Sequence, residues 1–295
     1  MPRARTKDGY ELHYETAGAG RPIVFVHEFA GDHASWEAQL RHFGKTHLCI
    51  SFSARGFAPS DVPTDTAAYD QARAVDDIAA VMDAAGVEKA HIVGLSMGAI
   101  ATLHFGVRYA DRALSLCLGG CGYGADLDRL DAFRQRSEQT ANAIRTMGMP
   151  DFARLYATGV GRVQFANKDP RGYEEFLGRL GGHDATGSAM TQHYLQGRRP
   201  SIYTLDASLK TLDLPTLIMV GDEDFPCIQP GVYLKRTIAG AALSVIPNTG
   251  HSINLEEPDE YNRILERFLC QVDAGRWPRR DTRVDALPDF TPYQN

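Results

Sequence analysis

Apolar, often β-branched positions occur in short runs along the chain, and the segments between them repeat apolar residues every three or four positions. Such runs predict buried strands of a parallel sheet, and the intervening segments predict amphipathic helices. The predicted strands are residues 23–26, 47–52, 91–95, 113–118, 215–220 and 242–246. The predicted helices lie near residues 35–43, 69–85, 97–108, 230–238 and 258–270. The pattern therefore indicates an α/β fold, with one mostly parallel sheet flanked by helices.

The alternation changes in three places. Residues 6–16 alternate around an Asp-Gly turn, which predicts an N-terminal hairpin. Residues 122–212 contain arginine-rich helical segments broken by Gly, Pro and Asp, so we expect a helical lid inserted into a core made of residues 1–121 and 213–272. Residues 273–295 carry three prolines and many charges, and we expect a C-terminal tail that is irregular or mobile.

Composition narrows the class of protein. Hydrophobic residues make up 43% and charged residues 23% of the 295 positions, which is ordinary for a globular protein. A net charge of −6 argues against nucleic acid or an anionic membrane as the partner. The sequence shows neither an apolar run of about 18 residues, as a membrane helix needs, nor an apolar stretch behind the basic N-terminus that would make a signal peptide.

Five cysteines, an odd number without metal-ligand spacing, point to reduced thiols in a cytoplasmic protein. Cys49 and Cys117 fall in predicted core strands. Nothing in the pattern indicates an oligomeric state.

The motif Gly94-Leu95-Ser96-Met97-Gly98 stands between a predicted buried strand and a predicted helix. Glycines on both sides let the backbone reverse within a few residues, which would present the serine oxygen above the end of the sheet. The helix start would aim free N–H groups at a negative charge formed beside that oxygen. The alternative is a glycine-rich turn whose serine only caps the helix.

Polar residues follow the carboxyl ends of four predicted strands, where open parallel sheets bind their ligands. One strand leads into His27, one into Ser96, one into the acidic residues 222–224 and one into the loop that ends at His251. A serine, an acid and a histidine in this chain order, each just past a strand, form the arrangement expected for nucleophilic catalysis.

On these motifs, the chain resembles the α/β-hydrolase fold superfamily, in the branch of lidded esterases, lactonases and carbon–carbon bond hydrolases. The resemblance covers about residues 23–270. It is carried by the Ser96 motif, by Gly221-Asp-Glu-Asp224, and by Gly250-His251 followed by Glu257-Pro258.

The resemblance implies a role for each of these residues. Ser96 would be the nucleophile and His251 the base that removes its proton. Asp224 would orient His251, with Asp222 as the second choice for the acid. No metal or organic cofactor is implied.

By the same resemblance, two backbone N–H groups, those of Phe29 and Met97, would stabilise the oxyanion. One such donor is typically worth about 3 kcal/mol of transition-state stabilisation.

The chain departs from the usual family pattern at two motifs. His27-Glu28 replaces His-Gly, and Ser53 replaces the usual aspartate of the loop that includes Arg55, in which Ala58 also replaces a glycine. Since an unpaired buried carboxylate is costly, we hypothesise that Glu28 pairs with Arg55 or faces water in the pocket. The alternative is that Glu28 points outward and has no role.

The lid is expected to select the substrate. Most of its arginines are expected to be solvated, while one or two could bind a substrate carboxylate. They include Arg129, Arg134, Arg136, Arg145, Arg154, Arg162, Arg179, Arg198 and Arg199. Besides Glu28, the residues predicted by adjacency to line the pocket are Tyr123, Phe225 and Ile253.

The predicted function is hydrolysis of a small-molecule carboxylic ester or lactone by a serine hydrolase, through an acyl-enzyme on Ser96. A carbon–carbon bond hydrolase with the same triad is the first alternative, and perhydrolysis on the same residues is also open. Haloalkane dehalogenation is disfavoured, because that chemistry needs an aspartate where this chain has Ser96. A non-catalytic ligand receptor on the same fold is the alternative from a different class.

Overall fold

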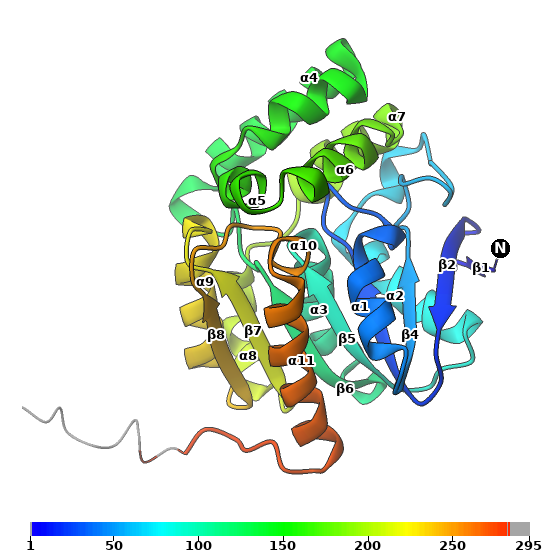
Figure 1. The fold of residues 1–295 in the computed structure, drawn as a ribbon. Coiled ribbons are helices and arrows are strands. Elements are labelled where there is room, and N and C mark those ends of the chain that lie inside the picture. The colour runs from blue at the N-terminus through cyan, green and yellow to red at the C-terminus, as the bar shows by residue number, and fades with distance from the viewer. Residues whose placement is uncertain (1, 282, 284–295) are drawn as a thin grey trace, which may run out of the picture.

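The computed structural model describes residues 2–281 and 283. Its centre is an eight-stranded sheet with the strand order β1-β2-β4-β3-β5-β6-β7-β8 (Figure 1). The strands are β1 (Arg3–Arg5), β2 (Glu11–Ala17), β3 (Arg21–Val26), β4 (His47–Phe52), β5 (Ala90–Leu95), β6 (Ala113–Gly119), β7 (Thr216–Gly221) and β8 (Ala241–Ile246). β3 to β8 run parallel, whereas β1 pairs with β2 and β2 pairs with β4 in an antiparallel manner.

Helices cover both faces of the sheet. The core helices are α1 (Glu37–Phe43), α2 (Gln71–Ala84), α3 (Met97–Arg108), α9 (Phe225–Thr237), α10 (Ile253–Glu256) and α11 (Pro258–Asp273). In β3, Ile23 and Phe25 pack toward α1 and α11, while Val24 and Val26 pack toward α2 and α3. This alternation buries both faces of the parallel strands, as their continuous apolar runs predict.

A helical insert joins β6 to β7. Its helices are α4 (Leu130–Ala157), α5 (Val163–Lys168), α6 (Pro170–Gly181), α7 (Ala185–Met190) and α8 (Asp206–Thr211). α4 to α7 form a layer above one end of the sheet, with an apolar core of their own that reaches down to Phe29 and Met97 (Figure 1). α4 is bent at Gly148, whose φ of 75° is open to glycine without strain.

Most elements lie where the sequence predicts them. The α/β fold, the hairpin, β4 and α3 are confirmed, the last two with the predicted bounds. Cys49 and Cys117 are buried in β4 and β6, as expected, and all five cysteines are free.

The predicted start of α9 at residue 230 is wrong. The helix begins at Phe225, and Pro230 lies inside it. The physical reason is that Pro226 occupies the first turn, where the missing N–H costs nothing.

The tail predicted for residues 273–295 is described only in part. Up to residue 281 it packs at the edge of the sheet, where the Trp277 indole donates to the Gly240 carbonyl at 2.7 Å and the Arg280 N–H donates to the Ala239 carbonyl at 2.8 Å. Residues 282 and 284–295 lie outside the described part.

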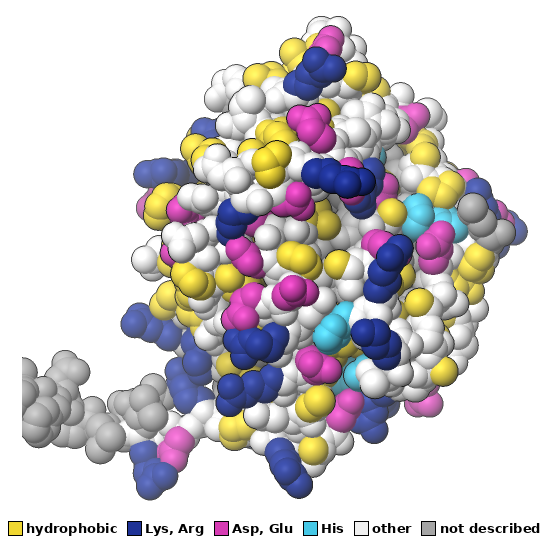
Figure 2. Space-filling view, in the orientation of Figure 1, with side chains coloured by type: hydrophobic (Ala, Val, Ile, Leu, Met, Phe, Trp, Pro, Cys, Tyr) yellow, Lys and Arg dark blue, Asp and Glu magenta, His cyan; other side chains and the backbone are white. Residues whose placement is uncertain are grey.

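Acidic and basic side chains are interspersed on the face shown in Figure 2. None of the helices in the described part of the chain is long and apolar enough to cross a membrane.

Candidate active site

Ser96 lies at a sharp turn between β5 and α3. Its backbone has φ 53° and ψ −111°, a conformation unusual for a residue with a side chain. The turn requires glycine on both sides, since a Cβ on Gly94 would lie 2.3 Å from the Gly98 carbonyl oxygen and one on Gly98 would lie 2.1 Å from that of Val26. Strain of this kind, held by the surrounding chain, is typical of a nucleophile elbow.

His251 and Asp224 come together from different loops. The His251 Nδ1 atom lies 2.6 Å from the Asp224 Oδ2 atom, although the residues are 27 positions apart. An ionised carboxylate only accepts hydrogen bonds, so Nδ1 carries the proton and Nε2 is left as the basic nitrogen.

The competing acids have other partners. Asp222 Oδ1 accepts the Thr249 backbone N–H at 3.1 Å, and Glu223 Oε1 accepts from Gln164 of the insert at 2.8 Å. Of the three acids, Asp224 is the one that the structure places against His251.

The electrostatics of this pair favour a charged histidine. Burial by itself would lower the pKa of His251, but the charge and hydrogen bond of Asp224 outweigh burial, and the net pKa lies above 6.5. Burial would raise the pKa of Asp224, yet the charge of His251 and its hydrogen bond hold that pKa below 3.8. The site therefore stabilises the imidazolium that forms when a base accepts a proton.

The insert holds the backbone of His251 directly. Its N–H donates to the carbonyl of Gly161 at 2.8 Å, and a Cβ on Gly161 would lie 3.1 Å from the Cβ of His251. On the preceding residue, the Gly250 N–H donates to Glu256 Oε2 at 2.9 Å. Lys168 of α5 lies 3.0 Å from the same Glu256 carboxylate. No sequence motif signals these contacts, because the accepting carbonyl belongs to a glycine far away along the chain.

Phe29 and Met97 lie where their backbones could serve an oxyanion. Phe29 follows β3 and Met97 opens α3, and both side chains are buried. Within the described residues, no acceptor engages the N–H of either residue. The Phe29 ring also contacts Tyr156 of α4, with ring centroids 5.9 Å apart.

His27 braces this loop through both nitrogens of its ring. Its Nδ1 donates to the Glu28 carbonyl at 2.6 Å, and its Nε2 accepts the Ala54 N–H at 2.9 Å. Burial lowers the pKa of His27, so the ring stays neutral in this role.

The hypothesis that Glu28 pairs with Arg55 is wrong, and so is the alternative that Glu28 points outward. Glu28 is 2% exposed, and its partner is Arg162 of the insert, which donates to Glu28 Oε1 at 3.1 Å and to Oε2 at 2.5 Å. Ser252, the neighbour of His251, donates to Oε1 at 2.9 Å. One carboxylate thus joins the loop before Phe29, the insert and the histidine loop.

Arg55 already has its own acids. Its guanidinium donates to both oxygens of Asp77, at 2.7 and 2.6 Å, and to both oxygens of Asp8. Asp77 and Asp8 therefore neutralise Arg55, which is the role that the sequence hypothesis gave to Glu28.

The other predicted pocket residues lie in different surroundings. Ile253 is fully buried in the same core cluster as Tyr261, and Phe225 is 71% exposed at the start of α9. Tyr123 is exposed, with its ring edge-on to that of Phe133. Their place in a pocket stays a prediction.

A cavity of about 30 Å³ lies beside Met97 and is closed by Leu195 of the insert and by Phe57 and Tyr69. It has room for about one or two water molecules. This cavity is therefore too small for an ester or lactone substrate.

Two lid arginines differ from the rest. Arg162 is buried and neutralised by Glu28, whereas Arg199 is half-buried with neutral partners. Arg199 donates to the Tyr123 carbonyl and to Gln196 Oε1, each at 2.5 Å. Burial lowers the pKa of Arg199 to about 10, a sign that its charge lacks compensation. Among the described residues, no carboxylate pairs with it.

The parallel sheet, with Ser96, Asp224 and His251 each placed after one of its strands, is the arrangement of the α/β-hydrolase fold. Residues 21–258 match the family model of the alpha/beta hydrolase fold, and the chain belongs to that family. It is a hydrolase of the α/β type.

Relatives within the family differ in what they cleave. The chain is 25% identical to 3-oxoadipate enol-lactonase 1 of Acinetobacter baylyi over 251 residues, covering 85% of this chain and 89% of that protein. It is 27% identical to 2-hydroxy-6-oxo-6-phenylhexa-2,4-dienoate hydrolase of Comamonas testosteroni over 282 residues, covering 88% and 91%. It superposes on a thermophilic esterase of Thermogutta terrifontis with a TM-score of 0.81 and 25% identity, covering 92% of this chain and 98% of that one.

Proposed function

We propose that this protein is a serine hydrolase that cleaves a carboxylic ester or lactone of a small molecule through an acyl-enzyme on Ser96. The observations that carry the proposal are the 2.6 Å contact between His251 Nδ1 and Asp224 Oδ2 and the strained turn that holds Ser96 between β5 and α3. A serine hydroxyl is a poor nucleophile until a positioned base takes its proton, and Asp224 leaves the Nε2 atom of His251 free for that task.

In the proposed reaction each of these residues has a defined role. His251 Nε2 accepts the Ser96 proton as Oγ attacks the carbonyl carbon, and the N–H groups of Phe29 and Met97 bind the resulting oxyanion. The C–O bond to the leaving group then breaks, and His251 returns the proton to the leaving alkoxide. A water molecule, deprotonated by His251, hydrolyses the acyl-enzyme and restores Ser96.

The substrate class follows from charge. The relatives named above include a 3-oxoadipate enol-lactonase and a dienoate hydrolase, whose substrates carry a carboxylate. Arg199 is a cation without a carboxylate partner in the described part of the chain. Guanidinium groups bind carboxylates in bidentate geometry. We therefore expect a monoester or lactone that retains one free carboxylate.

The direct test is covalent labelling. A fluorophosphonate should give a mass adduct on Ser96 of the wild-type protein and none on the Ser96→Ala variant. A folded protein without an adduct would favour the ligand receptor instead.

The second candidate is a carbon–carbon bond hydrolase, which the 27% identical relative supports. A panel of aryl esters, lactones, monoesters of diacids and a vinylogous diketone separates the two reactions. Turnover of esters or lactones without diketone cleavage favours the first proposal, and the reverse result favours the second. In both cases Ser96→Ala should lose turnover.

The same panel tests Arg199. Arg199→Met should raise KM for acidic esters about 10-fold or more and leave KM for neutral esters nearly unchanged, since a charge-assisted contact is worth about 1.5–3 kcal/mol. The control is Arg198→Met, because Arg198 is exposed over the Tyr194 ring. Equal effects on acidic and neutral esters would remove Arg199 from substrate recognition.

A further inference from the structure

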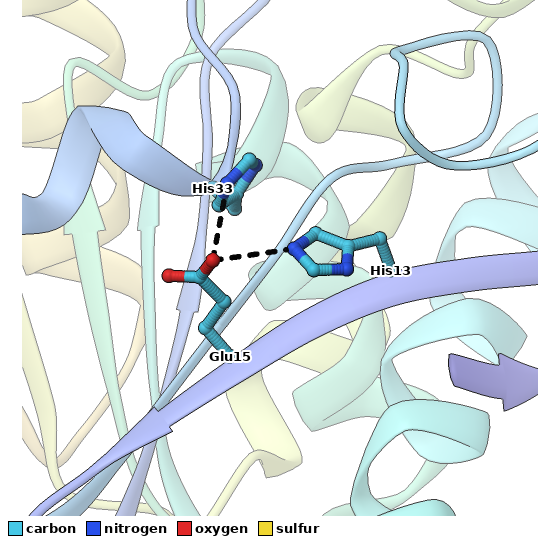
Figure 3. A group of neighbouring side chains, drawn as sticks. All are labelled: His13, Glu15 and His33. Carbon is cyan, nitrogen blue, oxygen red and sulfur yellow. Dashed lines mark hydrogen bonds and ion pairs between the residues drawn. The ribbon is translucent and has the colours of Figure 1, made fainter. Parts of the chain in front are cut away.

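Three potential metal ligands converge away from the candidate active site. His13 and Glu15 lie two residues apart on β2, so their side chains leave the same face of the strand. His33 reaches them from the 3₁₀ helix His33–Trp36. Figure 3 shows the Glu15 carboxylate directed toward both imidazoles.

The distances within this group are unusual for hydrogen bonds. Glu15 Oε1 lies 3.4 Å from His13 Nε2 and 3.6 Å from His33 Nε2 (Figure 3). Hydrogen bonds between nitrogen and oxygen cluster near about 2.9 Å and weaken beyond about 3.2 Å. Direct bonding therefore explains the arrangement poorly.

The same distances suit a shared cation. Ligand atoms about 2.0–2.2 Å from a tetrahedral Zn²⁺ lie about 3.3–3.6 Å from one another. Both measured separations fall in that range, and all three ligand atoms lie within 4.8 Å of one another. Two imidazoles and one carboxylate are also a ligand set that zinc accepts in proteins.

A second layer of contacts orients one of the rings. His33 Nδ1 lies 2.9 Å from Ser53 Oγ, which leaves Nε2 as the nitrogen that faces Glu15. Metal-bound histidines commonly donate their other ring N–H to an oxygen acceptor such as a carboxylate, a backbone carbonyl or water, and the Ser53 hydroxyl oxygen can accept in the same way. Ser53 is one of the residues at which this chain departs from the usual family pattern, so the departure gains a role here.

The site has one open side. The His13 side chain is 1% exposed, that of His33 is 17% exposed and that of Glu15 is 45% exposed. A cation could thus enter from solvent and retain a water molecule as its fourth ligand.

We propose that His13, Glu15 and His33 form a binding site for a zinc-type divalent cation, separate from the candidate active site. The bound ion would join β2 to the chain segment that leads from Phe29 into the 3₁₀ helix. It would therefore brace the loop that carries a candidate oxyanion donor, and its main effect would be on stability.

The test uses the full chain, freed of any polyhistidine tag and treated with a chelator. Isothermal titration with Zn²⁺ should show one ion bound per chain, and Co²⁺ should give the visible absorption of a tetrahedral site. Mg²⁺, which prefers oxygen ligands, should not bind. Added Zn²⁺ should raise the Tm.

Variants assign the ion to its residues. His33→Ala and Glu15→Gln should each lose Zn²⁺ binding, and Ser53→Ala should weaken it about 10-fold. The control is His42→Ala, since His42 lies outside the group and pairs with Glu266 on the surface. Glu15→Gln serves if His33→Ala fails to fold, because Glu15 is half exposed.

A second potential ligand group, made of Asp224, Cys227 and His251, must be separated from this site. The expected result is that His251→Ala still binds one Zn²⁺. No binding by the wild-type protein, or binding that survives in His33→Ala and disappears in His251→Ala, would overturn the proposal. Either outcome leaves the labelling of Ser96 unaffected, so the two proposals fail independently.

Discussion

Glu28 is a buried carboxylate, and Arg162 and Ser252 form hydrogen bonds with it. Its carboxylate is buried, and the charges of Arg162 and His251, with the hydrogen bonds of Arg162 and Ser252, outweigh that burial and keep the pKa of Glu28 below 4.5. The guanidinium of Arg162 also lies over the Phe176 ring, 5.1 Å from its centroid. Each charge of this pair is tolerable because the other is present.

The structure predicts what happens when one partner is removed. Glu28→Gln leaves Arg162 buried without its carboxylate, so the free energy of unfolding in urea should fall by about 3–5 kcal/mol. The double variant Glu28→Gln with Arg162→Met should recover much of that loss. The control is Glu260→Gln, whose surface pair with Arg263 should be worth less than about 1 kcal/mol. If Glu28→Gln and Glu260→Gln lowered the free energy of unfolding equally, a role for the buried pair would be contradicted.

Asp224 sets the protonation of His251, which predicts a pH profile. His251 must be neutral to act as base, so the wild-type kcat/KM should fall as the pH drops through a pKa above 6.5. Asp224→Asn should lower kcat by roughly 10⁴-fold, the size seen for this substitution in a serine protease. Without the carboxylate, burial dominates, and the acid limb of the remaining activity should move to lower pH. Asp222→Asn is the control, and a similar loss there would contradict the choice of acid.

Among the elements, the insert takes part in the site as well as covering it. The 3₁₀ turn Val160–Arg162 supplies the carbonyl of Gly161 to His251 and the guanidinium of Arg162 to Glu28. The position of His251 therefore depends on a segment about 90 residues away along the chain.

This dependence can be measured with one methyl group. Gly161→Ala adds a Cβ 3.1 Å from that of His251, closer than ordinary packing, so His251 must shift. We expect kcat to fall about 10-fold, since a misplacement of 1 Å can cost about 10²-fold. Gly178→Ala is the control, because a Cβ there meets nothing within 4 Å in helix α6. An unchanged kcat in Gly161→Ala would show that the turn yields freely.

The regular elements were the part of the fold that the sequence predicted best. Buried parallel strands such as β4 are continuous apolar runs, and α3 begins at a marked glycine turn, so local pattern was sufficient for both. The start of α9 was missed because Pro230 resembled a helix start, although the proline inside the first turn is Pro226. Two prolines four residues apart cannot be ranked by pattern alone.

At the scale of the whole molecule, the limits of prediction follow the distance between partners. His251 and an acid from residues 222–224 could be anticipated at one edge of the sheet, because both follow parallel strands whose ends meet there. The choice of Asp224 among these acids came from the family resemblance. The partner of Glu28 could not be anticipated, because nothing in the sequence distinguishes Arg162 from the other lid arginines. Of the partners of Glu28, only Ser252 lies next to a residue that the sequence had singled out, namely His251.

Buried histidines throughout the molecule predict its response to acid. Burial lowers the pKa of three of them to about 4, namely His91, His104 and His183. Between about pH 6.5 and 4, these three histidines bind fewer protons in the folded state than in the unfolded state. The free energy of unfolding should therefore fall as the pH is lowered through that window. His104→Gln should reduce the slope of unfolding free energy against pH between 6.5 and 4. A slope identical to that of the wild-type protein would contradict this account.

The hydrogen bond from His251 to the Gly161 carbonyl limits how the insert can be exchanged between related proteins. Replacing the insert between β6 and β7 by that of another protein would remove the acceptor of the His251 backbone N–H. A chimera must therefore place a carbonyl oxygen where that of Gly161 lies, because otherwise a change in substrate specificity could come from a displaced His251.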